Sequence, residues 1–156
     1  MSFFGLDLAQ KGLSLYTIPA AFAMAMLPNV YAVSGAGAHY DLCNPRKLQT
    51  SVVADDKIHK IAKARILRAK AASENAFETL GFYSAAVVAA NFAGVDAETV
   101  NVLTLGYIGS RALYNIIYVR LQDNRSFGLV RSLTWLASIA ITVTLYAKAA
   151  TQLASS

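Results

Sequence analysis

Charged residues are scarce in this sequence of 156 amino acids: they make up 15% of the chain, and hydrophobic residues make up 56%. A soluble domain usually carries about 25% charged residues. The charges also gather between long apolar runs instead of covering one polar surface. The composition therefore indicates a protein whose solvent is lipid. The net charge of +5 is better explained by membrane topology than by a nucleic-acid partner.

Cysteine is almost absent, and the single Cys43 excludes an internal disulfide. His39 and His59 lie in the same polar segment as Cys43, but their spacing matches no metal-ligand pattern, so we expect no metal site. The sequence also lacks a glycine-rich phosphate loop, a nucleophile elbow and an HExxH pattern. The first apolar run has no basic segment before it and no clear cleavage pattern after it, which favours a retained helix.

Four apolar runs are long enough to cross a bilayer as helices, since about 20 residues at 1.5 Å per residue span a hydrocarbon core of ~30 Å. We expect these helices at about 13–33, 71–93, 100–119 and 127–147. The first contains Pro19 and Pro28, which are tolerated where neighbouring helices provide partners for the carbonyl groups left without donors. The sequence thus predicts an all-α integral membrane four-helix bundle that forms a single domain over residues 1–156.

The three connections between the runs differ in charge. The first, residues 34–70, and the third, residues 120–131, are rich in Lys and Arg, whereas residues 94–98 have two acids and no base. Basic residues mark cytoplasmic connections. We therefore expect the first and third connections in the cytoplasm and both termini on the opposite side. Residues 57–70 are expected to form a helix that begins in water, contacts acidic lipids and continues into the membrane.

Polar and ionisable residues within the apolar runs are costly, and they usually mark a pathway or a site. Two groups share a helical face through spacings of three, four or seven residues: Arg68, Asn75 and Glu78 on the second helix, and Arg111, Tyr114 and Tyr118 on the third. We expect both faces to point inward. Glu78 and Arg111 are consistent with a buried ion pair that fixes helix register. Together with Arg68 and Arg131, however, they leave excess positive charge, which favours an anionic ligand such as a carboxylate.

Three short motifs resemble a known family. Residues 71–78 are similar to an R-A-x-x-N-x-x-E pattern, residues 110–118 to an Arg–aromatic–Tyr pattern, and residues 131–132 to an R-S pair that opens the fourth helix. On these motifs the chain resembles the membrane-associated proteins in eicosanoid and glutathione metabolism (MAPEG), which include microsomal glutathione transferases. The resemblance extends from about Asn44 to the end of the fourth helix. The first helix is similar only in length and position.

The resemblance implies a homotrimer of four-helix subunits in the endoplasmic reticulum, with glutathione as cofactor between neighbouring subunits near the cytoplasmic side. It implies a catalytic role for Arg131 beside the glutathione sulfur. It also implies that the cofactor is bound by Asn75, Glu78, Arg111, Tyr114, Tyr118 and Ser132. The chain departs from the family pattern at Ala71, where an Arg is common, and at Glu74, where many members have a basic residue. Arg68, one turn before Ala71, is a candidate substitute among the cofactor-binding residues.

The leading functional hypothesis is a membrane-bound enzyme, a glutathione-dependent transferase that acts on lipophilic electrophiles. A guanidinium beside a thiol of pKa near 8.5 favours the nucleophilic thiolate, which also suits reduction of lipid hydroperoxides. Two alternatives within the same fold are a non-catalytic lipid-binding scaffold and a glutathione-independent isomerase or cyclase acting on a hydrophobic metabolite. A small transporter that uses Glu78 as a proton-coupled site is a further alternative. The sequence does not identify the substrate.

Overall fold

The structure is a computed structural model that describes residues 2–3 and 6–155. Within these residues the regular secondary structure is helical except for one pair of two-residue antiparallel strands, β1 (Ser2–Phe3) and β2 (Leu6–Asp7). The helices are α1 (Thr17–Ala36), α2 (Leu48–Ala54), α3 (Lys60–Phe92), α4 (Ala97–Val119) and α5 (Phe127–Ala154). Two helical segments, Leu13–His39 and Phe127–Ala154, are long and apolar enough to cross a membrane.

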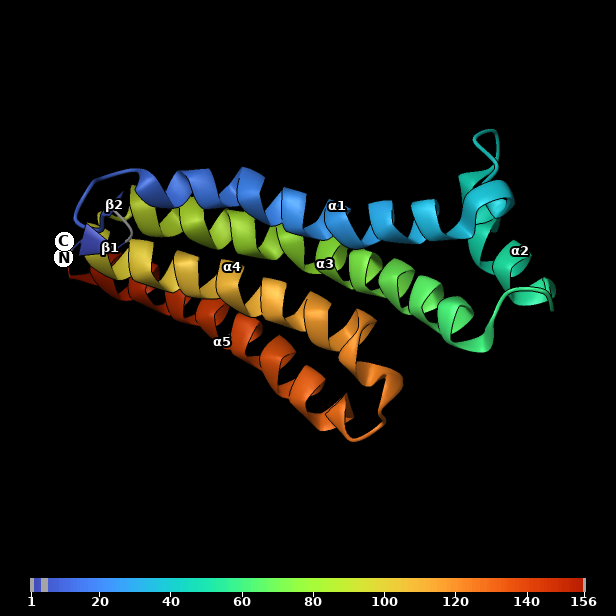
Figure 1. Cartoon of the computed structure of the whole chain (residues 1–156). Helices are drawn as coiled ribbons and strands as arrows, with labels where there is room; N and C mark the ends of the chain where they lie inside the picture. The colour runs from blue at the N-terminus through green and yellow to red at the C-terminus, as the bar shows by residue number, and fades with distance from the viewer. Residues whose placement is uncertain (1, 4–5, 156) are drawn as a thin grey trace.

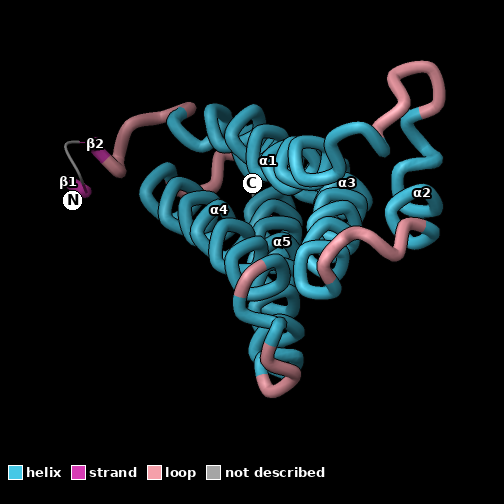
Figure 2. The backbone as a smooth tube through the Cα atoms, turned by 45° about the vertical axis from the view of Figure 1, so that its right-hand side comes forward, coloured by secondary structure: helices cyan, strands magenta, loops and turns pink. Residues whose placement is uncertain are grey.

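Four long helices, α1, α3, α4 and α5, run side by side along the length of the molecule (Figure 1). The β1–β2 pair and the end of α5 lie at one end, together with the turn between α3 and α4. Both basic connections lie at the other end, and α2 extends there beyond the four long helices (Figures 1 and 2). The two basic connections therefore lie at one end and both termini at the other, as the charge distribution predicts.

The helices α3, α4 and α5 are longer than their apolar runs. The helix expected at 71–93 is the second part of α3, which begins eleven residues earlier at Lys60, and α2 is a short helix that the sequence did not predict. The helix expected at 127–147 begins at Phe127 but continues to Ala154, because the sequence after Gly128 contains neither glycine nor proline to end it. An apolar run therefore predicts only the apolar part of a helix. Where the helix ends depends on residues such as glycine and proline that interrupt it.

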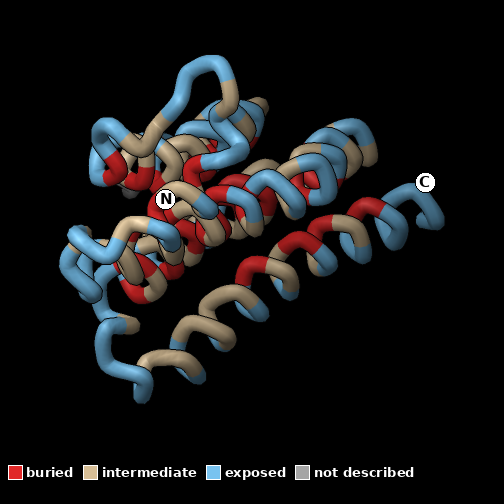
Figure 3. Tube along the Cα trace, turned by 90° about the vertical axis from the view of Figure 1, so that its right-hand side faces the viewer, coloured by how far each residue is buried: buried red, intermediate tan, exposed pale blue. Residues whose placement is uncertain are grey.

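Helix α5 contacts the other long helices along one narrow stripe of its surface. Its buried residues Ser138, Thr142, Leu145 and Ala149 are spaced by four, three and four, which places them on one face. Figure 3 shows this stripe along the side of α5 that faces the other helices. In Figure 1 the first turns of α5 diverge from α3, at the end where the basic connections lie.

Buried polar groups pair with one another at the end of the molecule that carries the termini. The amide of Asn101, which is 1% exposed, accepts a hydrogen bond from Ser14 N at 2.8 Å and donates to Leu8 O at 2.7 Å. Tyr83 shares a 2.6 Å hydrogen bond with Thr17 and stacks on Tyr107 with a centroid distance of 3.6 Å. These contacts fix the N-terminal segment against α3 and α4 without leaving the polar groups unsatisfied.

Pro28 lies inside α1, where its missing N–H leaves the carbonyl of Met24 without a helical donor. Asn115 on α4 provides the substitute, because its Nδ2 donates to Met24 O at 2.9 Å. The expectation that a neighbouring helix compensates for the proline is therefore confirmed at Pro28. Pro19, by contrast, lies in the first turn of α1, where backbone N–H groups have no helical acceptor.

We predict that Asn115→Ala lowers the free energy of unfolding by about 1–2 kcal/mol, because it leaves a buried carbonyl unpaired. In a protein that also carries Pro28→Ala, the N–H of residue 28 can donate to Met24 O. Asn115→Ala should then lower the free energy of unfolding by clearly less. Unfolding of the four proteins in detergent micelles measures this coupling. Equal costs in the two backgrounds would show that Asn115 does not compensate for the proline.

Candidate functional site

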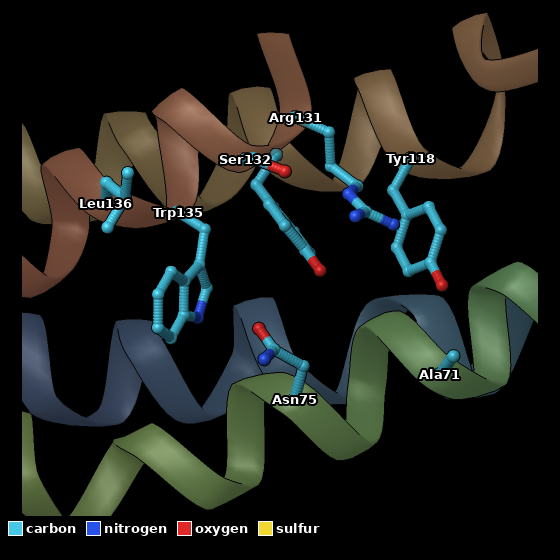
Figure 4. A pocket seen from close by; sticks show the side chains of 8 residues that line it. Ala71, Asn75, Tyr118, Arg131, Ser132, Trp135 and Leu136 are labelled. Carbon is cyan, nitrogen blue, oxygen red and sulfur yellow. The ribbon is translucent and has the colours of Figure 1, made fainter. Parts of the chain in front are cut away.

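A pocket of about 400 Å³ lies between α3, α4 and α5, in the half of the molecule near the basic connections. Its lining residues are Ala71, Asn75, Tyr114, Tyr118, Arg131, Ser132, Trp135 and Leu136. Figure 4 shows the α5 side chains extending toward Asn75 and Ala71 on α3. The lining contains a cation and several hydrogen-bonding groups, but no acidic residue.

One face of α5 contributes half of the lining, since residues 131, 132, 135 and 136 lie on adjacent turns. The guanidinium of Arg131 lies 4.8 Å from the ring centroid of Tyr118, and Figure 4 shows the two groups side by side. Arg131 has no ion-pair partner among the described residues. Ser132 donates to Gly128 O at 3.1 Å, which leaves its oxygen lone pairs available to a ligand. Arg131 is therefore a positioned cation with unused hydrogen-bonding capacity.

Behind the lining, a second guanidinium is almost completely buried. Arg111 on α4 is 2% exposed, and its Nη2 donates to Asn75 Oδ1 at 3.2 Å. Its guanidinium carbon lies 4.7 Å from the ring centroid of Tyr114, which in turn packs edge-on against Tyr118 at 5.6 Å. The polar side chains of α3 and α4 thus form one connected wall of the pocket.

Two donors in this region have no partner among the described residues: Arg111 Nη1 and Trp135 Nε1 are both buried and unsatisfied. In Figure 4 the indole nitrogen of Trp135 lies on the side of the ring that faces Asn75. An unsatisfied buried donor costs about 1–3 kcal/mol. Because both atoms are donors, the group that would satisfy them is an acceptor, such as a carboxylate or a peptide carbonyl.

The structure brings together six of the eight site residues predicted from the sequence. Five line the pocket, namely Asn75, Tyr114, Tyr118, Arg131 and Ser132, and Arg111 contacts two of them. Trp135 was missed as a site residue. The signal that could have identified it is its position one helical turn after Arg131.

The expectation that Glu78 faces inward is wrong for the single chain. Glu78 is exposed, and it does not form an ion pair with Arg111, whose hydrogen-bonding partner is Asn75. The reason is geometric: residues 72, 73 and 76 belong to the buried face of α3, and Glu78 lies on the opposite side of the helix. A carboxylate in the expected membrane span therefore points out of the chain.

A family model described as MAPEG family matches residues 13–151, which is most of the chain. The chain belongs to the MAPEG family. Membership indicates a membrane protein with a role in glutathione or eicosanoid metabolism. No curated protein and no solved structure matches the chain.

Arg68 of this MAPEG protein lies outside the pocket lining. Its guanidinium contacts the carboxylate of Asp123 and donates to Gln122 O at 2.9 Å and Val119 O at 3.3 Å. Arg65, three residues earlier on α3, donates from Nε to the same carboxylate at 2.9 Å. These contacts hold the connection between α4 and α5 against α3. Arg68 therefore does not replace the Arg that the family pattern has at the position of Ala71.

The two arginines also change the proton affinity of the carboxylate that they share. The hydrogen bond from Arg65, followed by that from Arg68, holds the pKa of Asp123 below its ordinary value of 3.8. The same hydrogen bond raises the pKa of Arg65. A carboxylate with a lowered pKa stabilises the fold at neutral pH, and this contribution is lost as the pH falls through the lowered value.

We predict that Asp123→Asn lowers the melting temperature at pH 7, because it removes the charge that holds Arg65 and Arg68. The difference from the unsubstituted protein should stay constant down to about pH 4 and shrink below it, where the carboxyl group becomes protonated in the folded protein as well. Thermal unfolding in detergent between pH 7 and pH 3 measures this. Asp56→Asn is the control, since the Asp56 side chain is fully exposed and its Lys63 partner is 4.0 Å away. A difference that does not depend on pH would contradict the assignment.

Proposed function

We propose that this MAPEG protein is a membrane-bound glutathione-dependent transferase whose cofactor binds in the pocket between α3, α4 and α5. The observation that carries the proposal is that the same lining contains Arg131, a cation without an acidic partner among the described residues, and Trp135 Nε1, a buried donor without a partner. Glutathione has two carboxylates and two peptide carbonyls, which are acceptors of the kind that these groups require. The residues present therefore fit the cofactor that family membership implies.

The residues of the pocket have distinct roles in this proposal. Arg111 and Asn75 act as one unit that orients acceptor groups of the ligand, since they are hydrogen-bonded to each other. Arg131 provides positive charge next to the reacting atom, where a guanidinium lowers the pKa of a thiol. Tyr114, Tyr118 and Ser132 supply hydroxyl groups around that charge. Bound glutathione would supply the thiolate that attacks an electrophile or reduces a lipid hydroperoxide.

The apolar end of the pocket is suited to the second substrate. Trp135 and Leu136 follow Arg131 along α5, and Leu136 is 52% exposed on the outside of the chain. Because α5 is apolar enough to cross a membrane, this end of the pocket would face lipid. A lipophilic electrophile could then enter from the bilayer without passing through water. The chemistry of the pocket does not define the electrophile further.

We also propose that all four long helices cross the bilayer as one domain, in the endoplasmic reticulum. Two of them pass a test of length and composition. The other two, α3 and α4, carry the polar residues of the site, which lowers their apolar character. Asn75, Arg111, Tyr114 and Tyr118 are buried or half-buried in the chain, whereas Glu78 faces outward. The basic connections share one end of the molecule, which supports a cytoplasmic location for that end.

The proposed assembly is a homotrimer in which α3 of each subunit contacts a neighbour. The outward face of α3 combines Glu78 with Gly81 and Ala85 at spacings of three and four, and all three are exposed. A carboxylate facing lipid is costly. Small residues permit close approach of helices within a membrane. A second copy of the chain covering this face would remove Glu78 from lipid and allow it to contribute to a neighbouring glutathione site.

A non-catalytic lipid-binding scaffold is the second candidate. Ala71 supports it, since this pocket lacks the second cation of the family pattern and Arg68 is held by Asp123. The two candidates differ in glutathione binding: the transferase requires it, whereas the scaffold requires only an apolar ligand. A glutathione-independent isomerase or cyclase, like the scaffold, would bind an apolar ligand without glutathione, but it would also convert that ligand to a product.

We predict that adding glutathione to the purified protein in detergent produces a saturable thiolate absorbance in the ultraviolet. Arg131→Ala should raise the pKa of the bound thiol and lower this signal at neutral pH by up to about tenfold per pKa unit, because each unit changes the ratio of thiolate to thiol tenfold. Arg125→Ala is the matched control, because Arg125 is exposed and does not line the pocket. Binding without a thiolate signal, or equal loss in both variants, would contradict the role of Arg131. Absence of binding, with retained affinity for an apolar ligand, would favour the scaffold.

We predict that the protein is trimeric in detergent and that Gly81→Trp disrupts the trimer. A Cβ atom added at Gly81 meets no atom within 4 Å in the single chain, and Gly81 is exposed, so the substitution should mainly affect the contact with a neighbour. Gly109→Trp is the control, since residue 109 on α4 has equally free surroundings. Light scattering of the detergent complexes gives the mass of each variant. A trimer that survives Gly81→Trp would exclude a close contact through this face.

A further inference from the structure

A second groove lies between α1 and α4, and it shares no residue with the proposed glutathione pocket. Its volume is about 360 Å³. The residues that line it are Met24, Leu27, Pro28, Tyr31, Ala112, Asn115, Ile116, Val119 and Arg120. We refer to it as the α1–α4 groove.

The body of the α1–α4 groove is apolar and opens to the outside of the chain. Leu27 and Ile116, one on each helix, are both 55% exposed. The α1 side belongs to a segment that is apolar enough to cross a membrane. Asn115 is the one polar residue in the body of the groove. Its Nδ2 donates to Met24 O within the protein, and its buried Oδ1 has no partner among the described residues. The groove therefore has the chemistry of a site for a hydrocarbon chain.

One end of the groove is cationic. Arg120 follows the last turn of α4, and its guanidinium lies 5.0 Å from the ring centroid of Tyr31 on α1. Stacking on an aromatic ring holds a guanidinium in place and leaves its N–H groups free to donate at the ring edge. Arg120 is exposed and has no acidic partner among the described residues. In contrast, Arg65 and Arg68 at the same end of the molecule are both paired with Asp123.

The distance between the two parts of the groove matches an amphiphile. Ala112 and Arg120 are eight residues apart on nearly continuous helix, which corresponds to about 12 Å along the axis. An acid group at Arg120 would therefore lie at the membrane surface on the side of the basic connections, with its chain extending along α1 toward the bilayer centre. The cationic end is the end that the positive-inside rule assigns to the cytoplasm.

We propose that the α1–α4 groove binds one anionic phospholipid of the cytoplasmic leaflet, with its phosphate on Arg120 and one acyl chain in the groove body. An acyl chain gains little by moving from lipid into an apolar groove, because both surroundings are hydrocarbon. Selectivity therefore comes from the head group. A zwitterionic lipid brings a cationic ammonium group next to Arg120, and the groove lining has no acidic residue to bind that group. The site therefore prefers anionic lipids to zwitterionic lipids with the same chains, and it does so independently of glutathione.

The test is native mass spectrometry of the full-length protein in detergent, titrated with phosphatidylglycerol or with phosphatidylcholine of identical acyl chains. We expect one saturable phosphatidylglycerol site per chain and weaker binding of phosphatidylcholine. Arg120→Gln should weaken phosphatidylglycerol binding by at least about fivefold, the effect of one arginine near a membrane surface. Equal binding of the two lipids to the unsubstituted protein would overturn the proposal.

Three further variants separate this site from diffuse surface charge. Arg125→Gln removes another exposed arginine of the same connection, outside the groove, and should change binding less than twofold. Tyr31→Leu removes the ring under Arg120 and should weaken binding, whereas Tyr31→Phe keeps the ring and should not. Weakening in Arg125→Gln equal to that in Arg120→Gln, or equal effects of the two Tyr31 variants, would overturn the proposal.

The groove body is tested without any change in charge. Ala112→Phe places a large side chain in the groove and should weaken phosphatidylglycerol binding, while the cooperative thermal unfolding of the variant in detergent shows that it is folded. Unchanged lipid binding in Ala112→Phe would overturn the placement of the acyl chain. Because the lipid titration uses no glutathione, its result does not depend on whether the proposed transferase function is correct.

Discussion

Within a bilayer, a polar group must find its partner inside the protein, because the surrounding hydrocarbon offers none. The chain meets this constraint by pairing groups that are distant in sequence. The carbonyl left free by Pro28 is satisfied by Asn115, and Asn101 fixes the N-terminal segment through backbone groups of Ser14 and Leu8. The few donors that remain unpaired are therefore informative. Trp135 Nε1 belongs to the wall of a pocket that also contains Arg131, a cation without an acidic partner among the described residues.

The arginines of the chain differ in what they contact, and these contacts assign their functions. Arg68 shares Asp123 with a neighbouring arginine and is thereby structural. Arg111 is buried and orients Asn75. Arg131 and Arg120 have no acidic partner among the described residues, and each lies over a tyrosine ring at a distance of about 5 Å. A stacked, unpaired guanidinium is held in place while it retains its capacity to bind an anion, which is the common basis of both proposed sites.

Much of the candidate site follows from the sequence, because spacings of three and four place residues on one helical face. Asn75, Tyr114 and Tyr118 meet in the pocket for this reason. Helical spacing also predicted Arg68 and Glu78 in the pocket, but neither residue lines it. A shared face spans a wide angle, and the packing of α3 against α1, α4 and α5 decides which part of that face is buried. Neither the exposed position of Glu78 nor the contact of Arg68 with Asp123 could be predicted from spacing on one helix.

The sequence by itself determined the helical class, the positions of the apolar runs, the family and the residue types of the site. These properties are local, since they depend on composition, on periodicity and on short motifs. Only the tertiary structure decided which arginine is free to act. Arg68 and Asp123 are 55 residues apart, and their contact depends on how the connection between α4 and α5 folds back against α3. Electrostatic pairing acts over a few ångströms in space, so it is determined by packing and is not visible in the order of the residues.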